Sequence, residues 1–156
     1  MQRICRQGSA GSTIVRVKYA RLFDEFLTSN DTLRVYEGNQ LIFTSAKDRL
    51  LPLLEYIDRF AFDHQQVVIF DKIIGNAAAL LFIKADCQEV FSPLGSQLAI
   101  TTLEKYGIKY HFTRIVPCIQ KPDGEDMCPM EKLSVGKGPE EFHAAMLKII
   151  NKMQEI

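Results

Sequence analysis

FDKIIGNAAALLF, residues 70–82, combines the end of a buried strand, a tight connection and an alanine-rich helix. The run QVVIF, which ends at the phenylalanine of this stretch, is continuously apolar, as is typical of a central parallel strand covered on both faces. The alanines allow the following helix to lie close to a sheet. The stretch therefore predicts a strand-to-helix junction. The charged and polar residues at this junction belong either to a working site or only to the connection.

The residues before this junction predict a helix, a hairpin and a second helix. Apolar residues recur at helical spacing between Val17 and Thr28. TLRVY and QLIFT then flank the turn residues EGN (37–39), a pattern typical of a β-hairpin. The next helical face carries Leu53 and Leu54. Pro52 belongs in the first turn of that helix, because deeper inside it would remove a hydrogen bond and clash with the preceding turn.

The residues after the junction predict two more strands with a helix between them. CQEVFS (87–92) predicts a strand, and Ser92-Pro93 predicts the N-cap and first position of the following helix. That helix is expected to end at Gly107, which suits the left-handed conformation after a helix. IKYHFTRIV (108–116) alternates apolar and polar residues and predicts the last strand.

The C-terminal part predicts a loop with a KPDG turn and a final amphipathic helix that opens at Pro139. The whole order is then α-β-β-α-β-α-β-α-β-loop-α. A hairpin followed by alternating strands and helices predicts an α/β fold, a three-layer α-β-α sandwich around a mixed five-stranded sheet. We expect a flexible N-terminal segment over residues 1–16 and a single domain over residues 17–156.

Composition narrows the function classes. The chain has 156 residues and a formal net charge of zero, so no overall field attracts nucleic acid or an anionic membrane. The basic residues ahead of Asp24 form either a phosphate-binding arm or a solvated N-terminus. No apolar run reaches the length of a membrane span, and the N-terminus lacks the apolar region of a secretory signal. We therefore expect a cytoplasmic protein that does not associate with membranes.

The four cysteines lie far apart without a C-x-x-C pair, which argues against a disulfide framework. The three histidines do not supply ligand pairs at the spacing that a zinc site needs. We expect reduced thiols, no metal and no cofactor.

Three stretches carry a resemblance to a known family. FDKIIGNAAALLF, EVFSPLGSQLAITTLEKYGI and DMCPMEKL together resemble short bacterial proteins grouped as a domain-of-unknown-function family, DUF1893, with a cytidine-deaminase-like fold. The resemblance covers residues 17–150. It implies the fold and does not imply an activity.

The deaminase-like fold permits a test of zinc chemistry. Zinc deaminases carry H-x-E at the start of the helix after the hairpin and P-C-x-x-C at the start of the next helix. The corresponding positions here read TSAKDR (44–49) and DKIIGN (71–76), without a histidine, a cysteine or the matching glutamate. The zinc motifs are absent, so we do not expect a zinc-dependent deaminase.

The junctions remain candidates for a ligand site. In an open α/β sheet the crevice lies beyond the carboxyl ends of the strands, where helix N-termini favour a phosphate or carboxylate. Thr44 and Ser45 offer hydroxyls from the first junction, and Asp71 and Lys72 offer charges from the second. Each has an alternative role. Ser45 can be only a turn or cap hydroxyl, and Asp71 can accept only the backbone N–H groups of the next loop. Lys72 can be solvated or paired with a nearby acid.

Gly75 and Asn76 belong to the same predicted ligand site. Gly75 allows a ligand to approach the backbone closely, or it allows close packing of the helix on the sheet. The family pattern has lysine after this glycine, whereas this chain has Asn76. This departure weakens the expectation that charge holds a phosphate here, although asparagine can form hydrogen bonds.

CPMEK (128–132) is the second candidate. If its loop folds over the crevice, Glu131 and Lys132 reach a ligand's hydroxyls or phosphates; otherwise they begin a helical turn and pair with neighbouring charges. Cys128 is either a nucleophile or a buried structural thiol, and no histidine can be assigned to activate it.

These observations favour a catalytically degenerate deaminase-fold protein that binds a nucleotide or a related phosphorylated small molecule. One alternative is a metal-independent enzyme acting on a nucleoside-type substrate, with Asp71 as general base or Cys128 as nucleophile. Another is an oligomeric interaction module, for example a homodimer.

Overall fold

The computed structural model describes residues 10–154 of the chain. Helix α1 (Ala10–Thr28) belongs to a first compact unit that ends at Asn30, and all the following elements belong to a second unit that begins at Asp31.

The first helix starts at Ala10, earlier than the predicted start near Val17. Residues 10–16 of the segment expected to be flexible are thus helical, and residues 1–9 lie outside the described residues.

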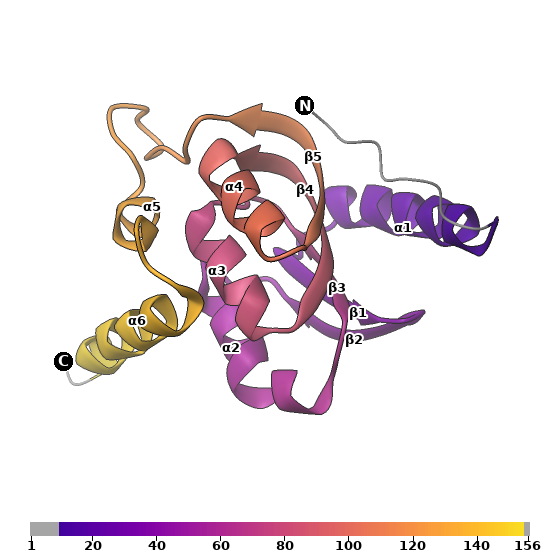
Figure 1. The fold of residues 1–156 in the computed structure, drawn as a ribbon, viewed down its shortest axis with the longest axis horizontal. Helices are drawn as coiled ribbons and strands as arrows, with labels where there is room; N and C mark the ends of the chain where they lie inside the picture. Colours follow the sequence, from indigo (N-terminus) through magenta and orange to yellow (C-terminus); the bar gives the residue numbers. More distant parts are fainter. Residues whose placement is uncertain (1–9, 155–156) are drawn as a thin grey trace. The chain divides into compact units, whose positions relative to one another are not determined.

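The second unit contains one sheet with the strand order β2-β1-β3-β4-β5 (Figure 1). Its strands are β1 (Leu33–Glu37), β2 (Gln40–Ser45), β3 (Val67–Asp71), β4 (Cys87–Ser96) and β5 (Lys109–Val116). Strand β1 is antiparallel to both β2 and β3, whereas β3, β4 and β5 are parallel. The prediction of a mixed five-stranded sheet is confirmed. The carboxyl ends of β2, β3, β4 and β5 consequently lie along the same edge.

The helical elements of this unit are α2 (Leu51–Arg59), the 3-10 helix η1 (Ala61–Asp63), α3 (Asn76–Lys84), α4 (Gln97–Lys105), α5 (Pro129–Ser134) and α6 (Pro139–Gln154). Helix α3 is central, because it packs against α2, α4, α5 and α6. Figure 1 shows α2, α3 and α4 on the same face of the sheet. This placement is expected when β3, β4 and β5 are joined by right-handed crossovers in one direction. Coverage of the opposite face by a helix remains a prediction.

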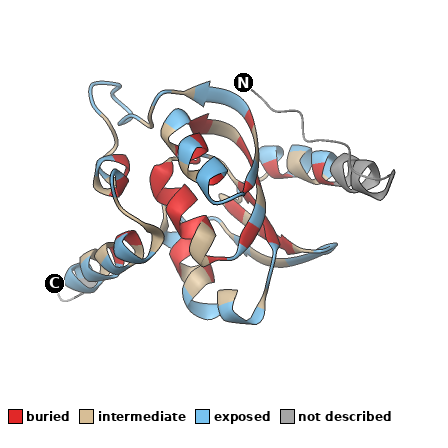
Figure 2. Cartoon of the chain, viewed as in Figure 1, coloured by how far each residue is buried: buried red, intermediate tan, exposed pale blue. Residues whose placement is uncertain are grey.

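The stretch 70–82 is the centre of the core. Every residue of α3 from Asn76 to Phe82 is buried, and residues 67–70 of β3 are fully buried (Figure 2). Phe142 and Met146 of α6 join the same apolar cluster. The predicted buried strand and closely packed helix are confirmed.

Three local sequence signals also have their expected structures. Glu37 pairs with Gln40 across a two-residue turn in which Gly38 has a φ of 59°. Pro52 lies in the first turn of α2. Gly107, just after α4, has a φ of 74°, the left-handed conformation that glycine tolerates best.

The prediction that Ser92-Pro93 starts a helix is wrong. Strand β4 continues to Ser96, whose Oγ accepts a hydrogen bond from the backbone N–H of Ala99 at 3.0 Å and so caps α4. Proline is compatible with this strand because the ladder to β5 uses the residues on either side of Pro93. Ser92 makes a turn-like contact instead, with its Oγ donating to the carbonyl of Leu94 at 2.8 Å.

Candidate functional site at the carboxyl edge of the sheet

The predicted site residues Ser45 and Asp71 lie at the carboxyl edge of the sheet. Leu33, at the start of β1, pairs with Ser45 at the end of β2 on one side and with Asp71 at the end of β3 on the other. Residues directly opposite each other in antiparallel strands point to the same face. Since Leu33 belongs to the core that the helices cover, Ser45 and Asp71 point to that face too, about 10 Å apart. The structure therefore brings these two candidates to one place.

Thr44 does not join them. It pairs with Arg34, and Arg34 pairs with Phe70, so Thr44 lies on the opposite face from Ser45. The two hydroxyls predicted to act together point apart. Ser45 also has a local role, because its Oγ accepts the backbone N–H of Lys47 at 3.1 Å.

Asp71 is half-buried at the end of β3, and the half-buried Lys72 follows it. Its Oδ1 accepts the backbone N–H of Ile73 at 3.4 Å, the local role considered for it above. Burial raises the pKa of Asp71 from 3.8 to about 7, although the backbone N–H groups of Ile73 and Lys72 favour the charged form. A carboxyl with this pKa is present in both protonation states at neutral pH, so it can donate or accept a hydrogen bond.

This pKa predicts how stability depends on pH. The unfolded chain releases the Asp71 proton near pH 4, whereas the folded chain holds it until about pH 7. The folded state binds more protons between these values, so the free energy of unfolding falls as pH rises through this window. Asp71→Asn should remove that fall and stabilise the protein at pH 8 by on the order of 1–2 kcal/mol, since partial exposure keeps the penalty below its full value. Urea unfolding from pH 4 to pH 8 measures this.

The exposed Asp48 provides the matched control. Asp48→Asn should retain the wild-type fall in stability between pH 4 and pH 7. Identical pH profiles for the wild type and Asp71→Asn would contradict the prediction.

A carboxylate of the chain itself occupies the N-terminus of α3. Glu131 of α5 is only 2% exposed. Its Oε1 accepts the backbone N–H of Asn76 at 2.5 Å, and its Oε2 accepts the backbone N–H of Ile119 at 2.7 Å. Helix N-termini have unpaired N–H groups and a partial positive charge, which favour an anion. Glu131 supplies an anion at a helix N-terminus that was expected to favour a phosphate or carboxylate.

Gly75 serves this internal contact. A Cβ on residue 75 would lie 2.8 Å from Oε1 of Glu131 and 3.0 Å from Cγ1 of Ile119. The missing side chain makes room for Glu131.

Asn76 is buried and connects three helices. Its Nδ2 donates to the carbonyl oxygen of Ser134 at 3.3 Å and to the Oγ of Ser134 at 3.0 Å, and its Oδ1 accepts from the hydroxyl of Thr102. Ser134 and Thr102 had no place in the sequence prediction. The only signal for them is that a polar residue at the start of an apolar, buried helix needs partners.

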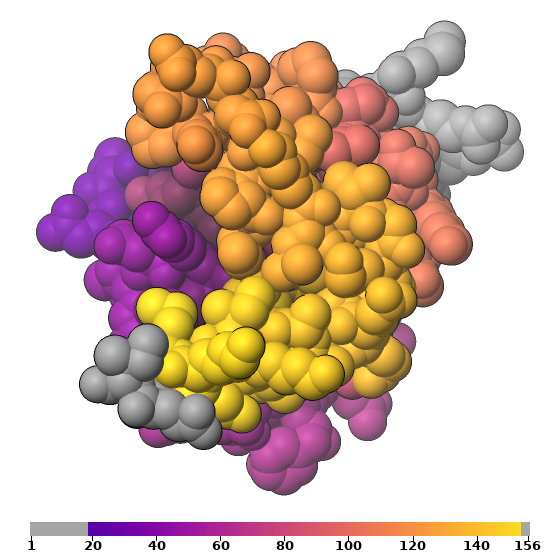
Figure 3. All heavy atoms as spheres, turned by 90° about the vertical axis from the view of Figure 1, so that its left-hand side faces the viewer, coloured from indigo at the N-terminus to yellow at the C-terminus, as the bar shows by residue number. Residues whose placement is uncertain are grey.

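The segment between β5 and α5 folds back onto α3. Gly124 donates its backbone N–H to Lys121 at 2.9 Å, which forms the predicted KPDG turn. Lys132 forms an ion pair with Asp126 of this segment, which is the pairing with a neighbouring charge that the sequence offered as its alternative role. Figure 3 shows the orange and yellow residues of this segment and of α6 covering one face of the molecule.

Cys128 is half-buried and immediately precedes α5. His64 and His111, which could activate a thiol, instead contact Glu37 at 3.0 Å and Glu89 at 2.5 Å. Among the hydrogen bonds of residues 10–154, none joins the thiol of Cys128 to a histidine or a carboxylate.

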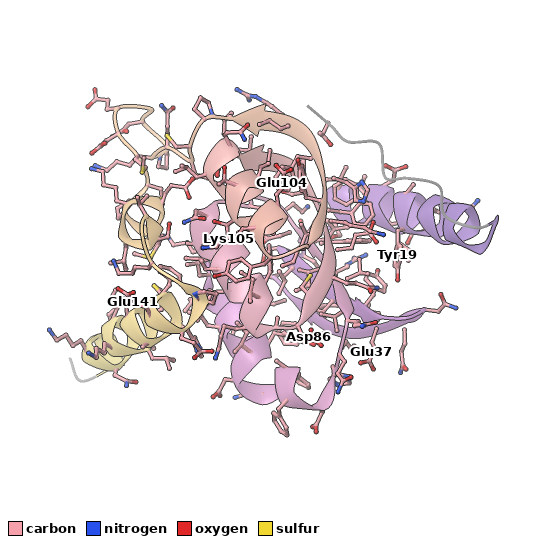
Figure 4. The ribbon with its side chains drawn as sticks, in the orientation of Figure 1. Tyr19, Glu37, Asp86, Glu104, Lys105 and Glu141 are labelled. Atoms are coloured by element: carbon pink, nitrogen blue, oxygen red, sulfur yellow. The ribbon has the colours of Figure 1, made fainter. Side chains whose placement is uncertain are left out.

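The amino edge of the sheet has a structural role. Glu37 accepts the backbone N–H of Gln65 at 2.9 Å, and Asp86 accepts that of Gln66 at 3.2 Å. Figure 4 labels both acids. They tie the connection before β3 to the sheet.

Within residues 10–154, no group of three or more histidine, cysteine, aspartate or glutamate residues is arranged to hold a metal ion. In the same part of the chain, no helix combines the length and apolar character needed to cross a membrane.

Comparison with known proteins agrees with the resemblance seen in the sequence. A family model described as TM1506, a domain of unknown function (DUF1893), matches residues 23–153. A crystal structure of a DUF1893 family protein (TM1506) from Thermotoga maritima has a similar fold, with a TM-score of 0.74 and 24% sequence identity over 95% of this chain and 96% of that chain. No curated protein matches. Because the family model matches most of the length of this chain, the chain belongs to the DUF1893 family of unknown function.

Proposed function

We propose that the chain is a catalytically degenerate, zinc-independent member of the cytidine-deaminase-like fold. In this proposal it binds a nucleotide or a related phosphorylated small molecule at the carboxyl edge of its sheet. The order of helices and strands supports the fold assignment. The stretches TSAKDR and DKIIGN, which stand where zinc deaminases carry their ligands and catalytic glutamate, support the loss of the zinc reaction.

Asp71 is the observation that carries the binding proposal. It is a half-buried carboxyl at the end of a central strand, with Ser45 on the same face. Its pKa of about 7 makes a donor and an acceptor available together at neutral pH. Amide and amidine edges of nucleobases present the complementary pair of groups.

Glu131 decides which end of the ligand lies at α3. Its buried carboxylate takes the backbone N–H of Asn76, and it repels a second anion there. We therefore place the base, rather than the phosphate, beside Asp71 and Ser45, with any phosphate directed away from α3.

A thermal-shift panel of nucleobases, nucleosides, nucleotides and sugar phosphates tests this proposal, followed by calorimetric titration of each active compound. We expect base-containing compounds to raise the melting temperature and sugar phosphates without a base to leave it unchanged. Asp71→Ala, which removes both the donor and the acceptor, should weaken binding at least about tenfold, since the loss of one hydrogen bond is expected to cost about 1.4 kcal/mol.

Thr44→Ala provides the matched control, because Thr44 neighbours Ser45 in sequence but lies on the other face of the sheet. It should bind like the wild type, whereas Ser45→Ala should bind more weakly. No shift with any base-containing compound, or equal affinity of the wild type and Asp71→Ala, would refute the proposal.

A metal-independent enzyme is the second candidate, and Asp71 favours it. A carboxyl with a pKa near the operating pH suits a general base. The same compounds can be followed for turnover by chromatography. Turnover lost in Asp71→Asn, with a melting temperature no lower than that of the wild type, identifies an enzyme. Binding without turnover identifies a binding protein. A homodimer remains a prediction for sedimentation analysis.

A further inference from the structure

Two cysteines stand on opposite arms of one hairpin between β5 and α5. Cys128 donates its backbone N–H to the carbonyl of Ile119 at 2.8 Å, and Gln120 and Met127 form an antiparallel bridge beside that bond. Cys118 immediately precedes Ile119. Cys118 and Cys128 are therefore diagonal neighbours across the hairpin, and both are half-buried.

The spacing suits a disulfide. Diagonal neighbours offset by one residue across an antiparallel pair have Cα atoms about 6 Å apart, within the range of about 4.4–6.8 Å that disulfides span. Strict alternation would turn the two side chains to opposite faces. Neither residue is held in a regular strand, however, because the chain bends at Pro117 and Cys118, and Cys128 is the cap residue of α5.

We propose that Cys118 and Cys128 form a reversible disulfide when the protein meets a low-molecular-weight disulfide such as oxidised glutathione. One protein thiolate attacks a sulfur of the small disulfide, which forms a mixed disulfide and releases one small thiol. The second protein thiolate then attacks the protein sulfur of that mixed disulfide and displaces the other small thiol. Two protein thiols are oxidised to one disulfide, and the small disulfide is reduced to two thiols that take up the two protons lost by the protein thiols.

The bridge would act on the contact at α3. Ile119, next to Cys118, donates its backbone N–H to Glu131, and Glu131 lies in the helix that Cys128 caps. A disulfide fixes the two arms of the hairpin, one of which carries Ile119 while the other leads into the helix that carries Glu131. The oxidised form therefore holds Glu131 at α3 more firmly than hydrogen bonds alone, and reduction loosens it.

Cys87 serves as an internal comparison. It is buried, its Sγ donates to the carbonyl of Glu89 at 3.2 Å, and burial raises the pKa of its thiol. A raised pKa keeps a thiol protonated and slow to exchange. Cys87 should stay reduced while Cys118 and Cys128 react.

The experiment uses the full chain with Cys5→Ser, so that only the thiols of the described residues take part. The protein is equilibrated with oxidised and reduced glutathione at several ratios, free thiols are alkylated, and the chain is cut at aspartate. Asp123 and Asp126 lie between the two cysteines, so cutting separates Cys118 from Cys128 unless a disulfide joins them. We expect a joined peptide pair that reduction splits, with Cys87 alkylated.

Melting temperature provides the second readout. Closing this short loop should raise the melting temperature of the oxidised protein by about 5 °C, and dithiothreitol should reverse the rise. Cys118→Ser should show neither the joined peptides nor the rise. Separate glutathione adducts on Cys118 and Cys128 without joined peptides would overturn the proposal. Joined peptides without a rise would overturn the claim that the bridge holds α5 in place.

Discussion

Glu131→Ala is expected to lower the free energy of unfolding by about 3–5 kcal/mol. The carboxylate is buried and accepts two backbone N–H groups, one at the start of α3 and one at Ile119. Alanine leaves both donors without this acceptor and opens a gap between α3 and α5. Equilibrium unfolding in urea measures the loss, and hydrogen exchange at the amides of Asn76 and Ile119 should accelerate.

Two further variants separate capping from other effects. Glu131→Gln keeps the shape but turns an N–H₂ group toward one of the two donors, so about half of the loss should remain. Glu141→Ala removes an exposed glutamate of α6, which Figure 4 labels, and should change stability by less than about 0.5 kcal/mol. Equal stabilities of Glu131→Ala and Glu141→Ala would show that Glu131 does not hold α3.

Gly95→Ala is expected to cost about 3 kcal/mol. A Cβ on residue 95 would lie 2.1 Å from Cδ2 and 2.2 Å from Cε2 of Phe112. Phe112 is only 8% exposed, so its ring has little room to move. The backbone is also held, because Gly95 pairs with Ile115 on one side and with Ile74 on the other.

A double variant tests this explanation. Gly95→Ala combined with Phe112→Leu should cost at least about 1 kcal/mol less than the sum of the single changes, because the smaller side chain relieves the overlap. Gly138→Ala is the control, since no atom lies within 4 Å of its added Cβ and no positive φ is recorded for it. Additive costs for Gly95 and Phe112 in urea unfolding would exclude the overlap as the cause.

The same glycine shows why the sequence prediction failed locally. Ser92-Pro93 has the composition of a helix start, and Gly95 would then lie inside the helix. In the structure, β4 and β5 continue to pair from Leu94 to Ser96, and a ladder of hydrogen bonds outweighs the local preference. The serine that caps the helix is Ser96.

The sequence also predicted only part of the arrangement at the candidate site. Ser45 and Asp71 could be placed together from the sequence, because both follow strands whose carboxyl ends share an edge. Thr44 could not be excluded from them without the register of β2 against β1. The sequence predicted Glu131 as a ligand contact, which stays a prediction, and it did not predict the contact with Asn76, which lies 55 residues away in the chain.

By itself the sequence determined the elements whose signals are local: the fully apolar β3, the alanine-rich α3, the Gly38 hairpin turn, and from them a mixed five-stranded sheet. These signals act through backbone conformation and apolar periodicity within a few residues. Only the tertiary structure decided that Glu131 closes the N-terminus of α3 and that Gly95 lies against Phe112. A buried polar group or a missing side chain takes its meaning from whichever distant segment the folded chain brings beside it, and no short pattern in the sequence specifies that segment.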